Sequence, residues 1–187
     1  VPGISGEAFG ARYDLLAEKF RQAGYYFVRY AAWKDREELG TKNIPIIHQE
    51  FDDIIAFLMS KGCSKIGFIG KSFGGGLSLT YRHPAVKGIV VWAPAFGTAE
   101  KDNIEEWKHR TFNQIQSTTD IKLSKKFLQD LKIPVRIIQG TADAQIPLAN
   151  SERLLPLLPQ GELIRLAGVD HSYYNPEHMK LVIKKSV

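Results

Sequence analysis

The sequence predicts a three-layer α/β sandwich, in which helices cover both faces of a mostly parallel β-sheet. Three apolar runs, at residues 66–69, 88–92 and 135–138, are nearly continuous rather than alternating, as in strands buried on both faces. Longer amphipathic stretches separate them, an alternation typical of right-handed crossovers in a parallel sheet. We expect a single domain over residues 1–187, because this length fits one domain and can bury a sizeable core.

The first elements follow from the spacing of apolar side chains. Spacings of three and four residues predict a helix over residues 7–23, with Gly24 as its stop. The side chains that set this spacing are Phe9, Tyr13, Leu16 and Phe20. Residues 26–30 are aromatic and β-branched and predict a strand, and the polar residues 31–43 predict a loop. A second helical stripe follows and ends at Gly62; its members are Ile47, Phe51, Ile54, Ile55 and Leu58.

The second half of the chain adds one irregular segment to this alternation. A weaker apolar run at residues 163–166 predicts the last strand, and the last helix is expected to start near Pro176. Residues 97–132 are rich in charge and too few for a core of their own, so we expect a small helical excursion over the edge of the sheet. Within it, Ser124 is a plausible N-cap for a helix over residues 125–131.

Charge, hydropathy and cysteine content exclude several classes of protein. Lys and Arg exceed Asp and Glu by five, without a block of five or six basic residues, so we expect no nucleic-acid partner. The longest apolar runs are strand-sized, and we expect no membrane partner. The single cysteine, Cys63, rules out an intramolecular disulfide framework and suits a reducing compartment, so we expect a cytoplasmic protein.

The chain opens at Val1 without an initiator Met, directly into turn residues. We therefore expect the natural polypeptide to start further upstream, and the first strands of the sheet to lie outside this chain. A signal peptide would also lie in that upstream part.

The most informative motif is Gly-Lys-Ser-Phe-Gly at residues 70–74, between an apolar strand and a helix. In a Gly-x-Ser-x-Gly turn of this kind, Ser72 sits on a sharp, strained bend with its hydroxyl exposed above the sheet. A phosphate-binding P-loop is excluded, because its first glycine would fall at Lys65 and strand-like residues occupy the place of the loop.

A serine hydroxyl needs a base, and the base needs a carboxylate that fixes its tautomer. Asp143 lies just beyond the strand at residues 135–138, and His171 lies just beyond the strand at residues 163–166. Together with Ser72 they fall at the carboxyl ends of parallel strands, where open α/β sheets gather their sites. Asp170 is the alternative acid, but its adjacency to His171 makes the reach back to Nδ1 difficult, so Asp143 is preferred.

With these motifs the chain resembles the α/β-hydrolase superfamily, in particular small serine hydrolases with little or no lid, such as dienelactone hydrolases and short-chain carboxylesterases. The resemblance covers nearly the whole chain. It implies that Ser72 is the nucleophile, Asp143 the orienting acid and His171 the general base. It also implies that the Phe73 N–H is one oxyanion donor. The second donor is left open among three residues: Val1, Gly3 and Ile4.

The resemblance carries one structural expectation of its own. In this fold the strand before the oxyanion loop lies in the middle of the sheet. If residues 1–187 were the complete protein, the sheet would have a central gap that exposes strand edges.

Aromatic side chains are candidates for an acyl-binding pocket, and we take Trp92, Phe96 and Trp107 as the substrate-binding set, although several of the aromatics must belong to the core. The remaining histidines show no spacing typical of a metal site; they are His48, His83, His109 and His178. We therefore expect neither a metal nor a cofactor.

These observations predict a cofactor-independent serine hydrolase of an ester or related acyl compound. Its partner is a small-molecule acyl substrate, and a homodimer is compatible with the sequence. Fold does not fix the substrate, so a peptidase, a thioesterase and an acyltransferase remain alternatives. A non-catalytic, hydrolase-like binding module is the alternative of another class.

Overall fold

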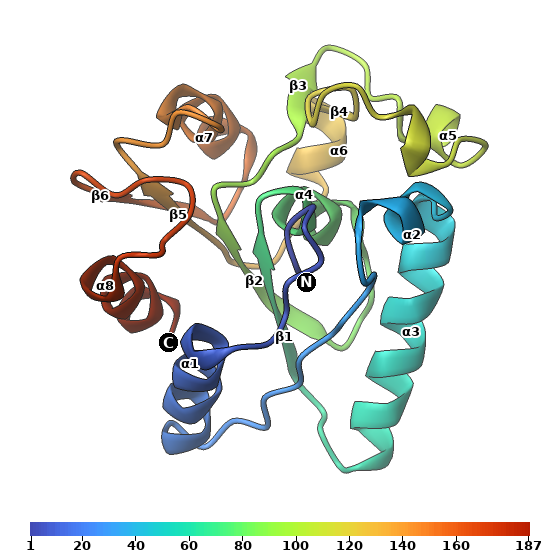
Figure 1. Ribbon diagram of the computed structural model, residues 1–187. Coiled ribbons are helices and arrows are strands. Elements are labelled where there is room, and N and C mark those ends of the chain that lie inside the picture. The colour runs from blue at the N-terminus through green and yellow to red at the C-terminus, as the bar shows by residue number, and fades with distance from the viewer.

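The computed structural model describes residues 1–187 and contains a four-stranded parallel sheet with helices on both faces (Figure 1). The sheet strands are β1 (Ile66–Lys71), β2 (Val86–Trp92), β5 (Val135–Gly140) and β6 (Gly161–Leu166), in the order β1-β2-β5-β6. The α-helices are α1 (Ala11–Gln22), α2 (Arg36–Gly40), α3 (Ile44–Ser60), α4 (Phe73–Thr80), α5 (Ile104–Trp107), α6 (Lys125–Gln129), α7 (Leu148–Leu154) and α8 (Pro176–Ser186). None of these helices has the length and apolar character needed to cross a membrane.

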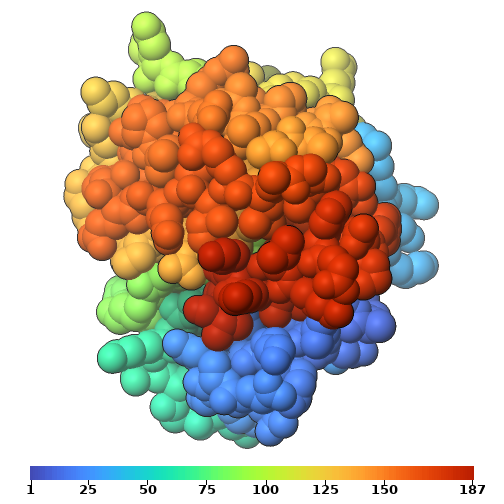
Figure 2. All heavy atoms as spheres, turned by 90° about the vertical axis from the view of Figure 1, so that its left-hand side faces the viewer, coloured from blue at the N-terminus to red at the C-terminus, as the bar shows by residue number.

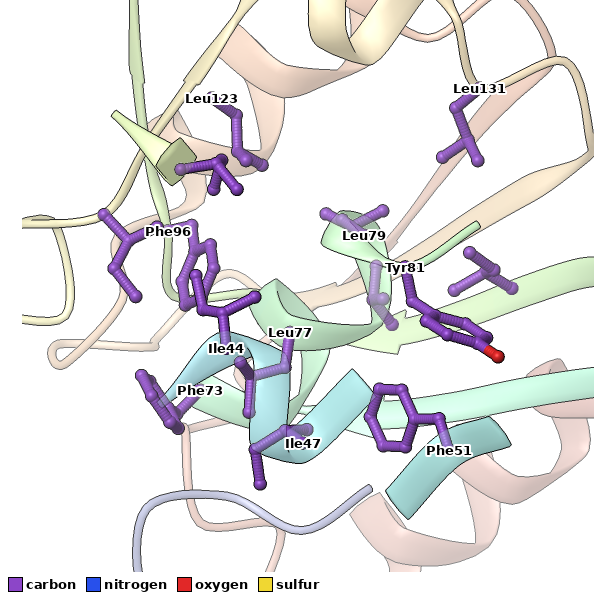
Figure 3. Close-up of a cluster of buried hydrophobic side chains, with 14 of the residues drawn as sticks. Ile44, Ile47, Phe51, Phe73, Leu77, Leu79, Tyr81, Phe96, Leu123 and Leu131 are labelled. Atoms are coloured by element: carbon purple, nitrogen blue, oxygen red, sulfur yellow. The ribbon is translucent and has the colours of Figure 1, made fainter. Parts of the chain in front are cut away.

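One face of the sheet is covered by α3 and α4, and side chains from both helices form the larger core. Ile47 of α3 lies close to Leu77 of α4, and Phe51 of α3 packs against Tyr81, with ring centroids 5.2 Å apart (Figure 3). Ile89 and Val91 project from β2 into the same core, because alternate residues of a strand point to one face. The core is almost free of solvent, since Ile47, Leu77 and Val91 are 0% exposed.

The opposite face is covered by α1 and α8, which lie side by side (Figure 2, blue and red). Leu16 of α1 and Val182 of α8 belong to a second core together with Trp92 and Ile138 of the sheet. The indole N–H of Trp92 donates to the hydroxyl of Ser186 at 2.9 Å, which fixes α8 to the middle of the sheet. The three-layer arrangement predicted from the sequence is therefore confirmed.

Two elements near the N-terminus differ from the sequence prediction. Residues 26–30, predicted as a strand, form no ladder with a neighbouring strand. The predicted loop at residues 31–43 contains α2, which starts where the Asp35 carboxylate accepts the N–H of Glu38 at 2.9 Å. An N-capped helix of five residues has too little apolar periodicity to be read from spacing.

The segment of residues 97–132 holds more than helices. It contains α5, a 3₁₀ turn (Phe112–Gln114) and α6, but also two three-residue strands, β3 (Gly97–Ala99) and β4 (Lys122–Ser124), which pair in parallel. The Ser124 hydroxyl accepts the N–H of Phe127 at 3.1 Å, so the predicted N-cap is confirmed.

Strand β1 is an outer strand of the sheet. On the side away from β2, only its C-terminal part has a backbone partner. The Val1 nitrogen donates to Ile69 O at 2.6 Å, and the Lys71 N–H donates to Val1 O at 3.2 Å. Along the N-terminal part of β1, a groove of about 640 Å³ with mostly apolar walls separates the strand from residues 25–30.

Candidate active site

Ser72 occupies a sharp turn between β1 and α4. Its φ of 52° is the left-handed region, which a residue with a side chain rarely adopts. The turn is anchored to the end of β2, because the Ser72 N–H donates to Trp92 O at 2.8 Å. A Cβ at Gly70 would lie 2.5 Å from Gly74 O, so only glycine allows strand and helix to approach this closely.

Residues 1–6 lie against this turn. A Cβ built on Gly3 would lie 3.6 Å from the Ser72 Cβ, and one built on Gly74 would overlap Pro2 O. The Gly6 N–H donates to Gly3 O at 2.9 Å, which folds the segment into a tight turn. The backbone of Gly3, one of the predicted oxyanion residues, is therefore a direct neighbour of Ser72.

Asp143 and His171 form a hydrogen-bonded pair beyond the ends of β5 and β6. His171 Nδ1 lies 2.7 Å from Asp143 Oδ2, and both residues are less than 10% exposed. Asp143 Oδ1 accepts the N–H groups of Gln145 at 3.0 Å and Ile146 at 2.8 Å. Burial alone raises the pKa of Asp143, but the hydrogen bonds from His171, Ile146 and Gln145 outweigh it and hold that pKa below its usual range.

Gln139 is a member of this site that the sequence did not reveal. Its side chain is 0% exposed, and its Nε2 donates to Asp143 Oδ2 at 3.0 Å and to Ile146 O at 3.1 Å. Its Oε1 accepts the Ser151 hydroxyl at 2.8 Å. Gln139 directly follows the apolar run of β5, and the one sequence signal for its role is a polar residue at a strand position expected to be buried.

The three predicted catalytic residues lie at the same end of the sheet, beyond the carboxyl ends of β1, β5 and β6. Because His171 Nδ1 is bonded to Asp143, His171 Nε2 is the ring nitrogen left to exchange a proton with another group. The Ser72 hydroxyl makes no side-chain hydrogen bond in this structure. Asp170, the alternative acid, accepts instead from the Ser172 hydroxyl at 2.9 Å and from the Tyr173 N–H at 3.1 Å.

The three predicted substrate-binding aromatics are all buried. Trp92 packs edge-on against Tyr173, with ring centroids 5.9 Å apart. Phe96 packs against Phe73 at 5.7 Å, and Trp107 belongs to the same core cluster. Packing alone accounts for these positions, so their contact with a substrate stays a prediction. Within residues 1–187, no three His, Cys, Asp or Glu side chains are grouped to hold a metal.

The fold is that of known hydrolases. A monoacylglycerol lipase from Paleococcus ferrophilus superposes with a TM-score of 0.67 and 20% identity, over 99% of this chain and 93% of that one. A dienelactone hydrolase from Anabaena variabilis gives 0.71 and 19% identity, over 100% and 81%. The esterase domain of a Rhodothermus marinus protein gives 0.69 and 14%, over 98% and 81%.

At these identities the likeness establishes the fold, and the chain has the α/β-hydrolase fold, as the sequence predicted. No protein-family model matches the sequence. A search of curated proteins finds no match either.

Proposed function

We propose that this chain is a serine hydrolase that cleaves an ester or related acyl bond through an acyl-enzyme intermediate. The observation that carries the proposal is that two features lie at the same end of the sheet. A serine is held in a strained turn between β1 and α4, and a buried Asp143–His171 pair follows strands β5 and β6 of the same sheet. A nucleophile, a base and a group that orients the base are the parts that acyl transfer requires.

In the proposed reaction, His171 Nε2 takes the proton of the Ser72 hydroxyl while Ser72 Oγ attacks the substrate carbonyl carbon. Asp143 keeps the imidazole in the tautomer that carries its proton on Nδ1. The negative oxygen of the tetrahedral intermediate accepts the N–H of Phe73, at the N-terminus of α4, and a second N–H from Gly3 or Ile4. His171 then protonates the leaving group, and water releases the acyl group by the same steps.

An ester is the favoured substrate class. Three of the structural neighbours carry the names monoacylglycerol lipase, esterase and dienelactone hydrolase, which refer to ester cleavage. The predicted pocket is aromatic, which suits an apolar acyl group. The single cysteine, Cys63, is free and supports a reducing compartment such as the cytoplasm for this activity.

The direct test replaces the nucleophile. With p-nitrophenyl acetate, we expect Ser72→Ala to lower kcat by about 10⁶-fold, as loss of the nucleophile does in other triads. A fluorophosphonate probe should label the wild type at Ser72, identified by peptide mass spectrometry, and leave Ser72→Ala unlabelled. Ser60→Ala is the control, because Ser60 is an exposed serine of α3 whose hydroxyl donates only to Phe57 O.

Near-native esterase activity in Ser72→Ala, or absence of labelling in the folded wild type, would contradict the proposal. The second outcome would favour a non-catalytic binding module. Turnover of p-nitrophenyl esters, acyl-CoA thioesters and aminoacyl amides, compared at equal concentration, separates an esterase from a thioesterase or a peptidase.

A further inference from the structure

One backbone carbonyl, that of Ser172, links the two halves of the candidate site. It accepts from Lys71 Nζ at 3.4 Å and from Arg12 Nη1 at 3.2 Å. Ser172 directly follows His171, and Lys71 directly precedes Ser72. The carbonyl therefore joins the turn that carries the serine to the loop that carries the histidine, with α1 as a third support.

Arg12 is held firmly enough to act as a support. Its side chain is 15% exposed and forms an ion pair with Glu7. Its guanidinium lies 5.0 Å from the ring centroid of Tyr13 and 4.6 Å from that of Tyr174. Because Tyr174 belongs to the histidine loop, Arg12 contacts this loop at two points, once by a hydrogen bond and once by a cation–π contact.

Lys71 approaches the same loop from the serine side. Its half-buried ammonium lies 5.6 Å from the ring centroid of Tyr173. Tyr173 has a φ of 54°, and its N–H donates to the Asp170 carboxylate. A buried tyrosine in this backbone conformation persists only where its surroundings fix it, and Lys71 is one of the groups that do so.

We propose that Lys71 and Arg12 are positioning residues, which hold the Ser172 carbonyl and thereby set the His171 imidazole at the distance from Ser72 that proton transfer requires. This inference rests on the proposed serine hydrolase function. Proton transfer needs a separation of about 2.6–3.2 Å between the serine oxygen and the ring nitrogen. The Ser72 hydroxyl has no side-chain partner in this structure, and such contacts often tighten only when substrate binds, so the held loop defines the position from which the imidazole approaches Ser72.

The charge of Lys71 gives this arrangement a pH dependence. Burial and, to a smaller extent, the charge of Arg12 lower the pKa of Lys71 to about 8, against the opposing charges of Glu7, Asp143 and Asp170. As pH rises through 8 a growing fraction of the amine becomes neutral, and its hydrogen bond to the carbonyl loses the strength that charge supplies. Turnover should therefore fall as pH rises through 8, while the charge of Arg12 stays unchanged.

The test compares Lys71→Met and Lys71→Arg with the wild type, with kcat and KM for p-nitrophenyl acetate measured from pH 6 to pH 10. We expect Lys71→Met to lower kcat by about 10-fold to 100-fold with little change in KM, because misplacement of a catalytic group acts on the chemical step. Lys71→Arg should keep most of the activity and lose the decline above pH 8. Lys87→Met, at an exposed lysine of β2, is the matched control.

A second readout does not depend on turnover. If Lys71 and Arg12 clamp the loop through the Ser172 carbonyl, the amides of Tyr173 and Tyr174 exchange faster with deuterium in Lys71→Met than in the wild type. Wild-type kcat and pH profile in Lys71→Met, or unchanged exchange at both amides, would overturn the inference. Lack of fluorophosphonate labelling in the wild type itself would instead reject the proposed function, and the exchange measurement then decides on the clamp alone.

Discussion

Gln139 is a buried amide that donates a hydrogen bond to the carboxylate of Asp143. Asp143 Oδ2 receives two donors, His171 Nδ1 and Gln139 Nε2, and Oδ1 receives two backbone N–H groups. With four donors the carboxylate is fully satisfied as an anion, which agrees with the lowered pKa of Asp143. Gln139 also fixes the plane of the carboxylate, and so the direction in which it faces the imidazole.

At this scale we predict the effect of Gln139→Leu, a change of similar volume that removes the amide. The buried Ile146 O and Ser151 hydroxyl each lose a partner, so the free energy of unfolding should fall by about 1–3 kcal/mol. We expect kcat for p-nitrophenyl acetate to fall by about tenfold, because the carboxylate loses its orientation. Gln160→Leu removes an exposed amide that donates to Lys132 O and is the control. Equal activity in the two variants would show that Gln139 is not needed at the site.

At the scale of elements, the sequence predicted what depends on local pattern. The four sheet strands and helices α1 and α3 follow from apolar runs and spacing, and α8 starts at Pro176 as expected. Helix α1 starts at Ala11 rather than residue 7, which leaves Phe9 outside the helix and 53% exposed. The turn at Ser72 and the strand ends that carry Asp143 and His171 were predicted for the same reason, since each follows a recognisable strand.

What the sequence could not predict depends on contacts between distant residues. Residues 26–30 have the composition of a strand, but a strand also needs a hydrogen-bonded neighbour, which composition does not show. The parallel pairing of β3 and β4 rests on three residues each, too few for a period. The contacts of Gln139 with Ser151 and of Lys71 with Ser172 likewise appear only when separate segments of the chain meet.

Helix α4 illustrates an element whose sequence is fixed by its neighbours. A Cβ at Gly76 would overlap the ring of Phe96, so the helix presents a glycine where the segment after β2 passes. We predict that Gly76→Ala lowers the free energy of unfolding by about 1–3 kcal/mol, the usual cost of overpacking, as measured by urea denaturation. In Phe96→Leu, which gives the helix more room, the same change should cost less.

Gly67→Ala is the control for this prediction. A Cβ at Gly67 would lie 3.7 Å from Gly88 O, an ordinary contact. If Gly76→Ala were as stable as Gly67→Ala, the ring of Phe96 would not restrict this position of α4.

At the scale of the whole molecule, the outer edge of β1 is only partly covered. The N–H and C=O groups of Ile69 and Lys71 face the side of β1 away from β2. There the Val1 nitrogen donates to Ile69 O, and Val1 O accepts the Lys71 N–H. The Ile66 N–H instead donates to Ala85 O, on the side of β2. Since backbone groups alternate in direction along a strand, the Gly67 groups face the groove, whereas those of Phe68 and Gly70 face β2.

This alternation predicts an alternating pattern of hydrogen exchange along β1. The amides of Gly67 and Ile69 should exchange at least about tenfold faster than those of Phe68 and Gly70, because only the latter pair bond to β2. Deuterium exchange followed by NMR measures the four rates separately in one sample. Equal protection of all four amides would mean that the groove beside β1 is filled in solution.

The order of the strands along the chain also has a consequence for the timing of synthesis. The ribosome releases the Ser72 turn well before β5 and β6, and the bond between Trp92 and Ser186 spans 94 residues. A nascent chain would thus carry the proposed nucleophile for some time without the proposed base. Reactivity toward acyl compounds in the cell would therefore begin only when β6 docks and brings His171 to the site.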